Sequence, residues 1–191
     1  MKNIYLVGDS IRIGYDSFVR KRLNAVAQVY WNQDNARFVQ YTTRYLQMWA
    51  YEDCIPEDID FVHFNNGAWD IAHMKDGSRF NSVEQYIEGL KRNIGLMHII
   101  FPHAQLLFAT TACVLEERID PGFLRRNCDI EAYNEAAKKL MEKENIPVDD
   151  LYPISLQVTP DQRTPDGVHF TPGGFSVLGD AVADFLLPYL K

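Results

Sequence analysis

The feature that most constrains the fold is an alternation of short apolar runs with longer helical patterns. Five runs have the length and the apolar or β-branched content of strands: residues 3–8, 24–31, 59–64, 105–111 and 146–148. Strands that alternate with helices imply crossover connections, and these produce a parallel sheet with helices on both faces. We therefore expect an α/β fold, with functional residues in the loops that follow the strands.

Three helices can be assigned from apolar periodicity and from end signals. The first covers residues 82–100, with Asn81 as its expected cap and Glu84 three residues later. A second helix runs from about residue 128 to residue 144. The third, residues 171–187, opens on threonine followed by proline, which is a typical helix start.

Length and net charge narrow the number of domains and the kinds of partner that fit this chain. Its 191 residues fit a single domain, residues 1–191, without internal repeats. The net charge of −7 argues against nucleic acid or an anionic membrane as a partner. No apolar run approaches the roughly 20 residues of a membrane span, and the N-terminus lacks a signal-peptide pattern. We expect a cytoplasmic protein, and the sequence does not indicate its oligomeric state.

The cysteines do not form a metal-binding pattern. Cys54, Cys113 and Cys128 lie far apart in the sequence, without a second ligand at a typical spacing. Their odd number also fits a reducing compartment. We expect neither a metal nor another cofactor.

A serine follows the first expected strand directly, in the tripeptide Gly8-Asp9-Ser10. At such a strand-to-helix turn, backbone N–H groups are free and the local dipole favours negative charge. The N–H of Ser10 is therefore suited to an oxyanion that forms on a substrate carbonyl. Serine is also a common helix cap, so the tripeptide alone leaves both roles open.

A histidine near the C-terminus supplies the base that a serine nucleophile needs. It lies in Asp166-Gly167-Val168-His169, just before the last expected helix. Histidine titrates near neutral pH, and a carboxylate on its second ring nitrogen fixes the tautomer. Asp166 is close enough in sequence to provide that carboxylate.

Together, Gly8-Asp9-Ser10 and Asp166-x-x-His169 resemble the SGNH/GDSL hydrolase family, in order and in separation. The resemblance covers essentially the whole chain. It implies a three-layer α/β/α sandwich of the flavodoxin-like type with about five parallel strands. It also implies ester hydrolysis through an acyl-enzyme, with Ser10 as nucleophile, His169 as base and Asp166 as the residue that orients the base.

Two blocks depart from the family pattern, and both concern the oxyanion hole. The glycine that usually follows the second strand is absent from residues 32–38, so we expect a backbone N–H of Ala36 or Arg37 in its place. The family's Gly-x-Asn-Asp block reads Gly67-Ala68-Trp69-Asp70, with tryptophan in place of asparagine. We expect the side chain of Asn66 to replace that donor, with neighbouring Asn65 on the opposite face.

Other titratable residues have simpler interpretations. Asp70-x-x-His73 repeats the Asp-x-x-His spacing, so His73 is an alternative candidate for the base, although we expect it to shape the pocket or lie on the surface. His63 falls in an expected buried strand and should be a hydrogen-bonded core residue. His98 and His103 should face solvent.

Several arginines and aromatic residues are candidates for substrate contacts. Arg12, Arg37 and Arg44 suit a substrate anion, but pairing with surface carboxylates is the commoner use of such arginines. The aromatic candidates are more typical of core and helix faces than of a sugar or acyl pocket: Tyr41, Tyr45, Trp49, Tyr51 and Trp69.

The expected function is hydrolysis of a small carboxylic ester, for which an O-acetylated carbohydrate is one candidate. No long insertion is present to form an acyl tunnel, which favours a short acyl group. A thioesterase or lysophospholipase would use the same three residues on a longer chain. A non-catalytic binding protein is the alternative from another class, because two expected oxyanion donors are missing.

Overall fold

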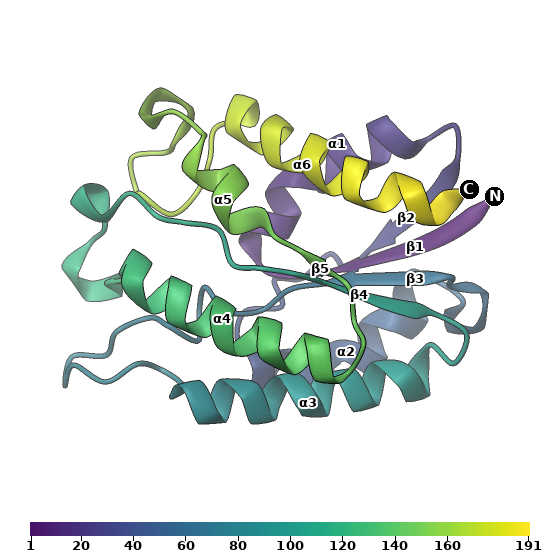
Figure 1. Ribbon diagram of the computed structural model, residues 1–191, viewed down its shortest axis with the longest axis horizontal. Helices are drawn as coiled ribbons and strands as arrows, with labels where there is room; N and C mark the ends of the chain where they lie inside the picture. Colours follow the sequence, from purple (N-terminus) through teal and green to yellow (C-terminus); the bar gives the residue numbers. More distant parts are fainter.

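The computed structural model describes residues 1–191, which form a five-stranded sheet between two layers of helices (Figure 1). The strands are β1 (Lys2–Val7), β2 (Ala27–Trp31), β3 (Phe61–Phe64), β4 (Gln105–Ala109) and β5 (Val148–Asp149). All pair in parallel in the order β2-β1-β3-β4-β5. This is the flavodoxin-like strand order, so the predicted fold class is confirmed.

Six α-helices cover the two faces of the sheet. They are α1 (Ser10–Leu23), α2 (Val39–Asp53), α3 (Val83–Ile100), α4 (Asn127–Lys143), α5 (Leu151–Leu156) and α6 (Pro172–Leu186). Helices α1, α5 and α6 pack on one face, and α2, α3 and α4 on the other (Figure 1). Short 3₁₀ turns are η1 (Pro56–Asp58), η2 (Glu116–Arg118), η3 (Pro121–Phe123), η4 (Pro160–Gln162) and η5 (Leu187–Leu190). None of the helices is long and apolar enough to span a bilayer.

The alternation of side chains along the strands builds two separate cores. In β1, Ile4 and Leu6 pack with the α1 and α6 face, while Tyr5 and Val7 pack with α2, α3 and α4. Strands buried on both faces read as continuous apolar runs, which explains why these segments were found from the sequence.

The helix ends show one error in the sequence prediction. Ser82, not Asn81, caps α3: its Oγ accepts the N–H of Gln85, whose side chain in turn accepts the N–H of Ser82. The side chain of Asn81 is occupied elsewhere, because it donates to Asp70. The start of α6 at Pro172 after a threonine is as predicted.

The carboxyl ends of all five strands meet at one edge of the sheet. The loops that follow β1, β2, β3 and β4 gather there, at the left of Figure 1, while both chain termini lie at the opposite end. Parallel α/β sheets bind ligands at this edge, so the fold brings Ser10 and the loop before α6 to a suitable place for a site.

Candidate active site

Ser10 is the first residue of α1, and its hydroxyl is not used as a helix cap. The cap is Asp9, whose carboxylate accepts the N–H of Ile11 at 2.9 Å. Asp9 is fully buried, and burial raises the pKa of its carboxyl. The hydroxyl of Ser10 instead lies 2.7 Å from Nε2 of His169, across 159 residues of sequence. Of the two roles that the tripeptide left open, the structure gives the helix cap to Asp9 and leaves the Ser10 hydroxyl beside His169.

His169 is oriented by Asp166 through its other ring nitrogen. The Nδ1 atom lies 2.6 Å from Oδ2 of Asp166. The second carboxylate oxygen accepts hydrogen bonds from the hydroxyl of Thr164 and from the N–H groups of Val168 and His169. Burial opposes ionisation of Asp166, but these hydrogen bonds outweigh it and hold the pKa of its carboxyl well below the ordinary value. Asp166 is therefore a carboxylate at neutral pH.

The loop that carries this pair has a fixed shape. Gly167 adopts φ +73, where a side chain is strained, and a Cβ there would lie 2.6 Å from the carbonyl oxygen of Leu115. Buried Arg163 ties the loop to the body of the protein through the carbonyl oxygens of Cys113 and Ser155. The Asp166–His169 geometry is therefore held by backbone and packing, as a catalytic pair requires.

A cavity of about 390 Å³ opens beside Ser10 and His169. This volume falls within the range of small-molecule sites. Its lining is mixed apolar and polar: Ser10, Asn35, Ala68, Trp69, Ile119, Asp120, Phe123, Arg125, Asp166, Val168 and His169. Of the aromatic candidates considered from the sequence, Trp69 alone lines this cavity. The sequence interpretation did not include Asn35, Phe123 or Arg125.

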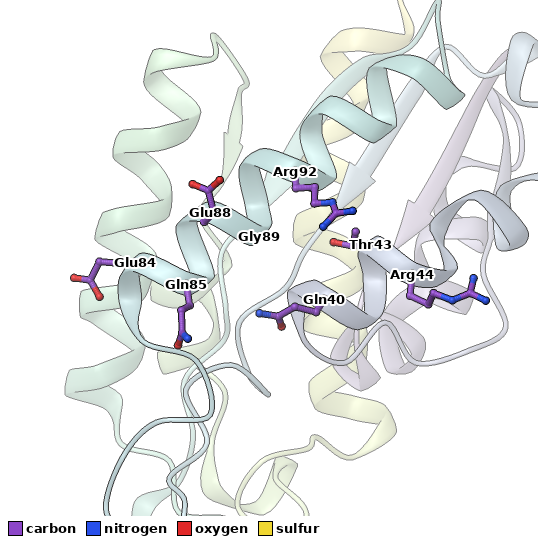
Figure 2. Close-up of a pocket in the computed structure, with 8 residues that line it drawn as sticks. All are labelled: Gln40, Thr43, Arg44, Glu84, Gln85, Glu88, Gly89 and Arg92. Atoms are coloured by element: carbon purple, nitrogen blue, oxygen red, sulfur yellow. The ribbon is translucent and has the colours of Figure 1, made fainter.

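A larger hollow, of about 860 Å³, lies elsewhere and has a different character. It runs between α2 and α3, and Figure 2 shows that its walls are polar side chains from these two helices, with Gly89. None of the residues that line it is hydrophobic, and none belongs to the Ser10–His169–Asp166 set. The smaller cavity is therefore the candidate site.

Comparison with known proteins decides the family. The model of the GDSL-like lipase/acylhydrolase family matches residues 6–177, from β1 into α6. The chain belongs to this family. It is therefore an enzyme of the esterase/acylhydrolase class, a carboxylic ester hydrolase. No curated protein matches the sequence.

Solved structures of related enzymes share the fold of this GDSL-like acylhydrolase. A lipase/acylhydrolase from Enterococcus faecalis is 23% identical, with TM-score 0.78 and coverage of 100% of this chain and 98% of that one. The acetyl xylan esterase AlAXEase is 20% identical, with TM-score 0.73 and coverage of 96% and 99%. A carbohydrate esterase family 3 protein from Talaromyces cellulolyticus is 16% identical, with TM-score 0.70 and coverage of 100% and 99%.

The two backbone donors predicted after β2 already make hydrogen bonds within this acylhydrolase. The N–H of Ala36 donates to the carbonyl oxygen of Gly8 at 3.0 Å, and the N–H of Arg37 donates to Oδ1 of Asn35 at 2.9 Å. Both donors are used within the protein. The N–H of Ser10 remains suitable, because the first residue of a helix has no acceptor within that helix.

The predicted side-chain donor, Asn66, also makes hydrogen bonds within the protein. Its amide donates to the carbonyl oxygen of Arg37 at 3.1 Å and to Oγ1 of Thr42 at 2.9 Å, on the α2 side of the sheet. Asn65 lies on the other side, against Gly8, where a Cβ would come within 1.9 Å of Oδ1 of Asn65. The same Cβ would lie 2.7 Å from Cβ of Arg12, so only glycine fits at position 8.

Asn35 offers a side-chain donor that the sequence analysis missed. It lines the same cavity as Ser10, and its Oδ1 already accepts the N–H of Arg37. Its Nδ2 makes no hydrogen bond to the protein. Asn35 lies in the divergent second block, directly before Ala36, where we expected a backbone donor. An asparagine at this place in the sequence was the one signal of a side-chain donor.

In the second Asp-x-x-His sequence of this acylhydrolase, the side chains of Asp70 and His73 are not hydrogen-bonded to each other. Nε2 of His73 contacts Asp129 at 2.7 Å, and His73 lines a different hollow. Buried His63 contacts Asp149 at 3.0 Å, which agrees with its expected role in the core. His98 and His103 are exposed, also as expected.

None of the three candidate arginines lines the cavity. Arg12 is buried beside Asp16, and it also donates to Oδ1 of Asn32 and to the carbonyl oxygen of Asp34. It therefore holds the loop after β2 against α1. Arg37 and Arg44 lie over tyrosine rings of α2, and neither forms the expected ion pair with a surface carboxylate.

Asp70 gives a prediction about stability. Burial raises the pKa of its carboxyl to about 7, although the side chain of Asn81 and the N–H of Val39 donate to it. In an unfolded chain this pKa is about 3.9. Between pH 4 and 7 the folded state thus holds a proton that the unfolded state has lost, and stability falls as pH rises through this window.

Asp70→Asn should therefore remove part of the pH dependence of unfolding. Relative to the variant, the wild-type protein should lose about 2–3 kcal/mol of unfolding free energy between pH 5 and pH 8. Urea titrations of both proteins at the two pH values measure this difference. A difference that does not change with pH would show that Asp70 is already ionised at pH 5.

Proposed function

We propose that the protein is a serine esterase that hydrolyses small carboxylic esters through an acyl-enzyme on Ser10. The observation that carries the proposal is the hydrogen-bonded chain Ser10–His169–Asp166, with distances of 2.7 and 2.6 Å, at the wall of a cavity of ligand size. A nucleophile, a base and a residue that orients the base are the parts that serine hydrolysis needs.

The proposed reaction has two half-reactions. The Ser10 hydroxyl attacks the ester carbonyl carbon while Nε2 of His169 takes its proton, and the negative charge on the carbonyl oxygen is met by the N–H of Ser10. The tetrahedral intermediate then expels the alcohol, which receives the proton from His169. Water, activated by His169, releases the acid from the acyl-enzyme in the same way. Asp166 stays ionised and stabilises the imidazolium.

The cavity favours a short acyl group. Its volume of about 390 Å³ is close to the lower end of the range for small-molecule sites, and bulky Trp69, Ile119 and Phe123 stand in its wall. Two proteins of the same fold are an acetyl xylan esterase and a carbohydrate esterase, which supports an acetylated carbohydrate as the substrate class.

A chain-length series tests this proposal. Among 4-nitrophenyl esters, kcat/KM should be highest for acetate or propionate and should fall at least about tenfold by octanoate, because the added methylenes do not fit. Acetylated sugars, assayed by acetate release, should also be hydrolysed. A maximum at octanoate or longer would favour a thioesterase or lysophospholipase. No turnover of any ester would favour a binding protein.

A further inference from the structure

One wall of the active-site cavity carries an arginine with no acidic partner. Arg125 follows the 3₁₀ turn η3 and lines the cavity together with Ser10 and His169. The residue is 6% exposed, so its guanidinium is largely removed from water. A buried charge is costly unless it is paired. The guanidinium lies over the ring of Trp69, with Cζ 5.9 Å from the ring centroid, but this contact uses none of its N–H donors in a hydrogen bond.

The protein satisfies Arg125 only in part. Nε donates to the carbonyl oxygen of Ala68, and Nη1 donates to that of Phe123 at 3.1 Å. Nη2 makes no hydrogen bond to the protein, and no carboxylate oxygen lies within 4.0 Å of the guanidinium. An arginine has five N–H donors, so donors remain for a ligand.

The other buried arginines of the protein are used differently. Arg12 pairs with Asp16, and Arg163 donates to two backbone carbonyl oxygens and to the sulfur of Cys113. Neither lines the active-site cavity. Arg125 thus differs from Arg12 in lacking an ion pair and from both in facing the space where substrate binds.

Two carboxylates, Asp120 and Asp166, line the same cavity as Arg125, so an anion would have to be bound by direct contact with the guanidinium. Burial lowers its pKa, while Asp9 and Asp166 raise it, and arginine stays a cation at neutral pH. Asp166 already holds His169, and Asp120, in the same cavity wall, accepts the N–H of Gly122 at 2.6 Å. Neither carboxylate is paired with the guanidinium.

We propose that Arg125 binds a carboxylate carried by the substrate, so that the enzyme prefers esters with a negatively charged group. A guanidinium fixed by two carbonyl oxygens presents its remaining donors in a set direction, which suits a planar carboxylate. The inference rests on the proposed function, because it places the carboxylate in the same small cavity as the attacked ester. The charged group belongs either to the acyl part or to the alcohol part of that ester.

Two matched substrate pairs test the proposal and distinguish these sources. For the alcohol part, 4-acetoxybenzoate is compared with 4-acetoxybenzamide. For the acyl part, monoethyl fumarate is compared with its neutral monoamide. In at least one pair the wild-type enzyme should prefer the anion by about tenfold or more in kcat/KM, mainly through KM. The preference should shrink as the salt concentration rises.

Arg125→Gln should bring that ratio close to one, and Arg125→Lys should give an intermediate ratio because it keeps the charge without the planar fork. Arg126→Gln is the matched control: it removes the same charge from the next residue, which lines a different hollow beside His73, so it should keep the wild-type ratio. The ratio is internal to each variant, so partial loss of folded protein does not change it.

Three results would overturn the inference. One is a wild-type enzyme that shows no anion preference in either pair. Another is an Arg125→Gln enzyme that loses kcat on all four substrates with its ratio unchanged, because Arg125 would then serve the transition state or the loop. The third is an equal loss of preference in Arg126→Gln. Turnover of neutral esters with fluorophosphonate labelling of Ser10 would leave the proposed function standing in all three cases, whereas absence of both would remove it too.

Discussion

Ser10→Ala should abolish nearly all esterase activity, with a loss in kcat of roughly 10⁴-fold or more. The hydroxyl of Ser10 makes its only hydrogen bond with Nε2 of His169, and the helix is capped by Asp9, so the fold should remain intact. Hydrolysis of 4-nitrophenyl acetate by the purified variant, together with its thermal melt, measures both effects.

A second serine of α1 provides the matched control for this variant. Ser17 is exposed and lies two turns further along the helix, away from the cavity. Ser17→Ala should keep wild-type turnover. If Ser10→Ala retained activity within tenfold of the wild type, another residue would have to be the nucleophile.

His169→Ala should be about as damaging as Ser10→Ala, because nucleophile and base act as one unit. The same substitution at His73 should have a much smaller effect, since His73 contacts Asp129 and lines another hollow. Both histidines stand three residues after an aspartate, so a difference between the two variants reports where each histidine lies in the structure and not its sequence pattern. Steady-state kinetics on one short ester are sufficient.

The aspartate that orients the base adds a graded result. Asp166→Asn should cost less than loss of either partner but still a large factor, because the amide lets the imidazole adopt the wrong tautomer. A larger loss of activity in His73→Ala than in His169→Ala would show that His73, not His169, is the base.

The strands, the Ser10 turn and the Asp166–His169 pair could be predicted because each depends on local sequence. Buried parallel strands read as apolar runs, and three residues are enough to join Asp166 to His169 within one loop. Helix α2 could not be predicted in this way. Its residue before the first turn, Phe38, makes no capping hydrogen bond from a side chain, so the usual start signal is missing.

The choice between Asn65 and Asn66 required the faces of the sheet. Along β3, Val62 and Phe64 pack with α2, α3 and α4, whereas Phe61 packs with α1 and α6. Continuing this alternation places Asn66 with α2 and Asn65 on the side of α1, the helix that begins with Ser10. The period was visible in the sequence, but which face bears Ser10 was not.

Arg125 and Ala36 lay beyond sequence reasoning for a different reason. The loop between β4 and α4 is long and contains the 3₁₀ turns η2 and η3. Arg125, which follows η3, is held beside the cavity by its hydrogen bond to the carbonyl oxygen of Ala68. The N–H of Ala36 is taken by Gly8, a contact between two loops that no local pattern encodes. Such positions follow from tertiary packing alone.

The central claim is that Ser10 is the nucleophile of an esterase, and covalent labelling tests it most directly. A fluorophosphonate probe should react with the wild-type protein, and peptide mass spectrometry should find one adduct, on Ser10. The Ser10→Ala and His169→Ala variants should remain unlabelled, because the first lacks the hydroxyl and the second lacks the base that activates it. An unlabelled wild-type protein, or an adduct on any residue other than Ser10, would contradict the account.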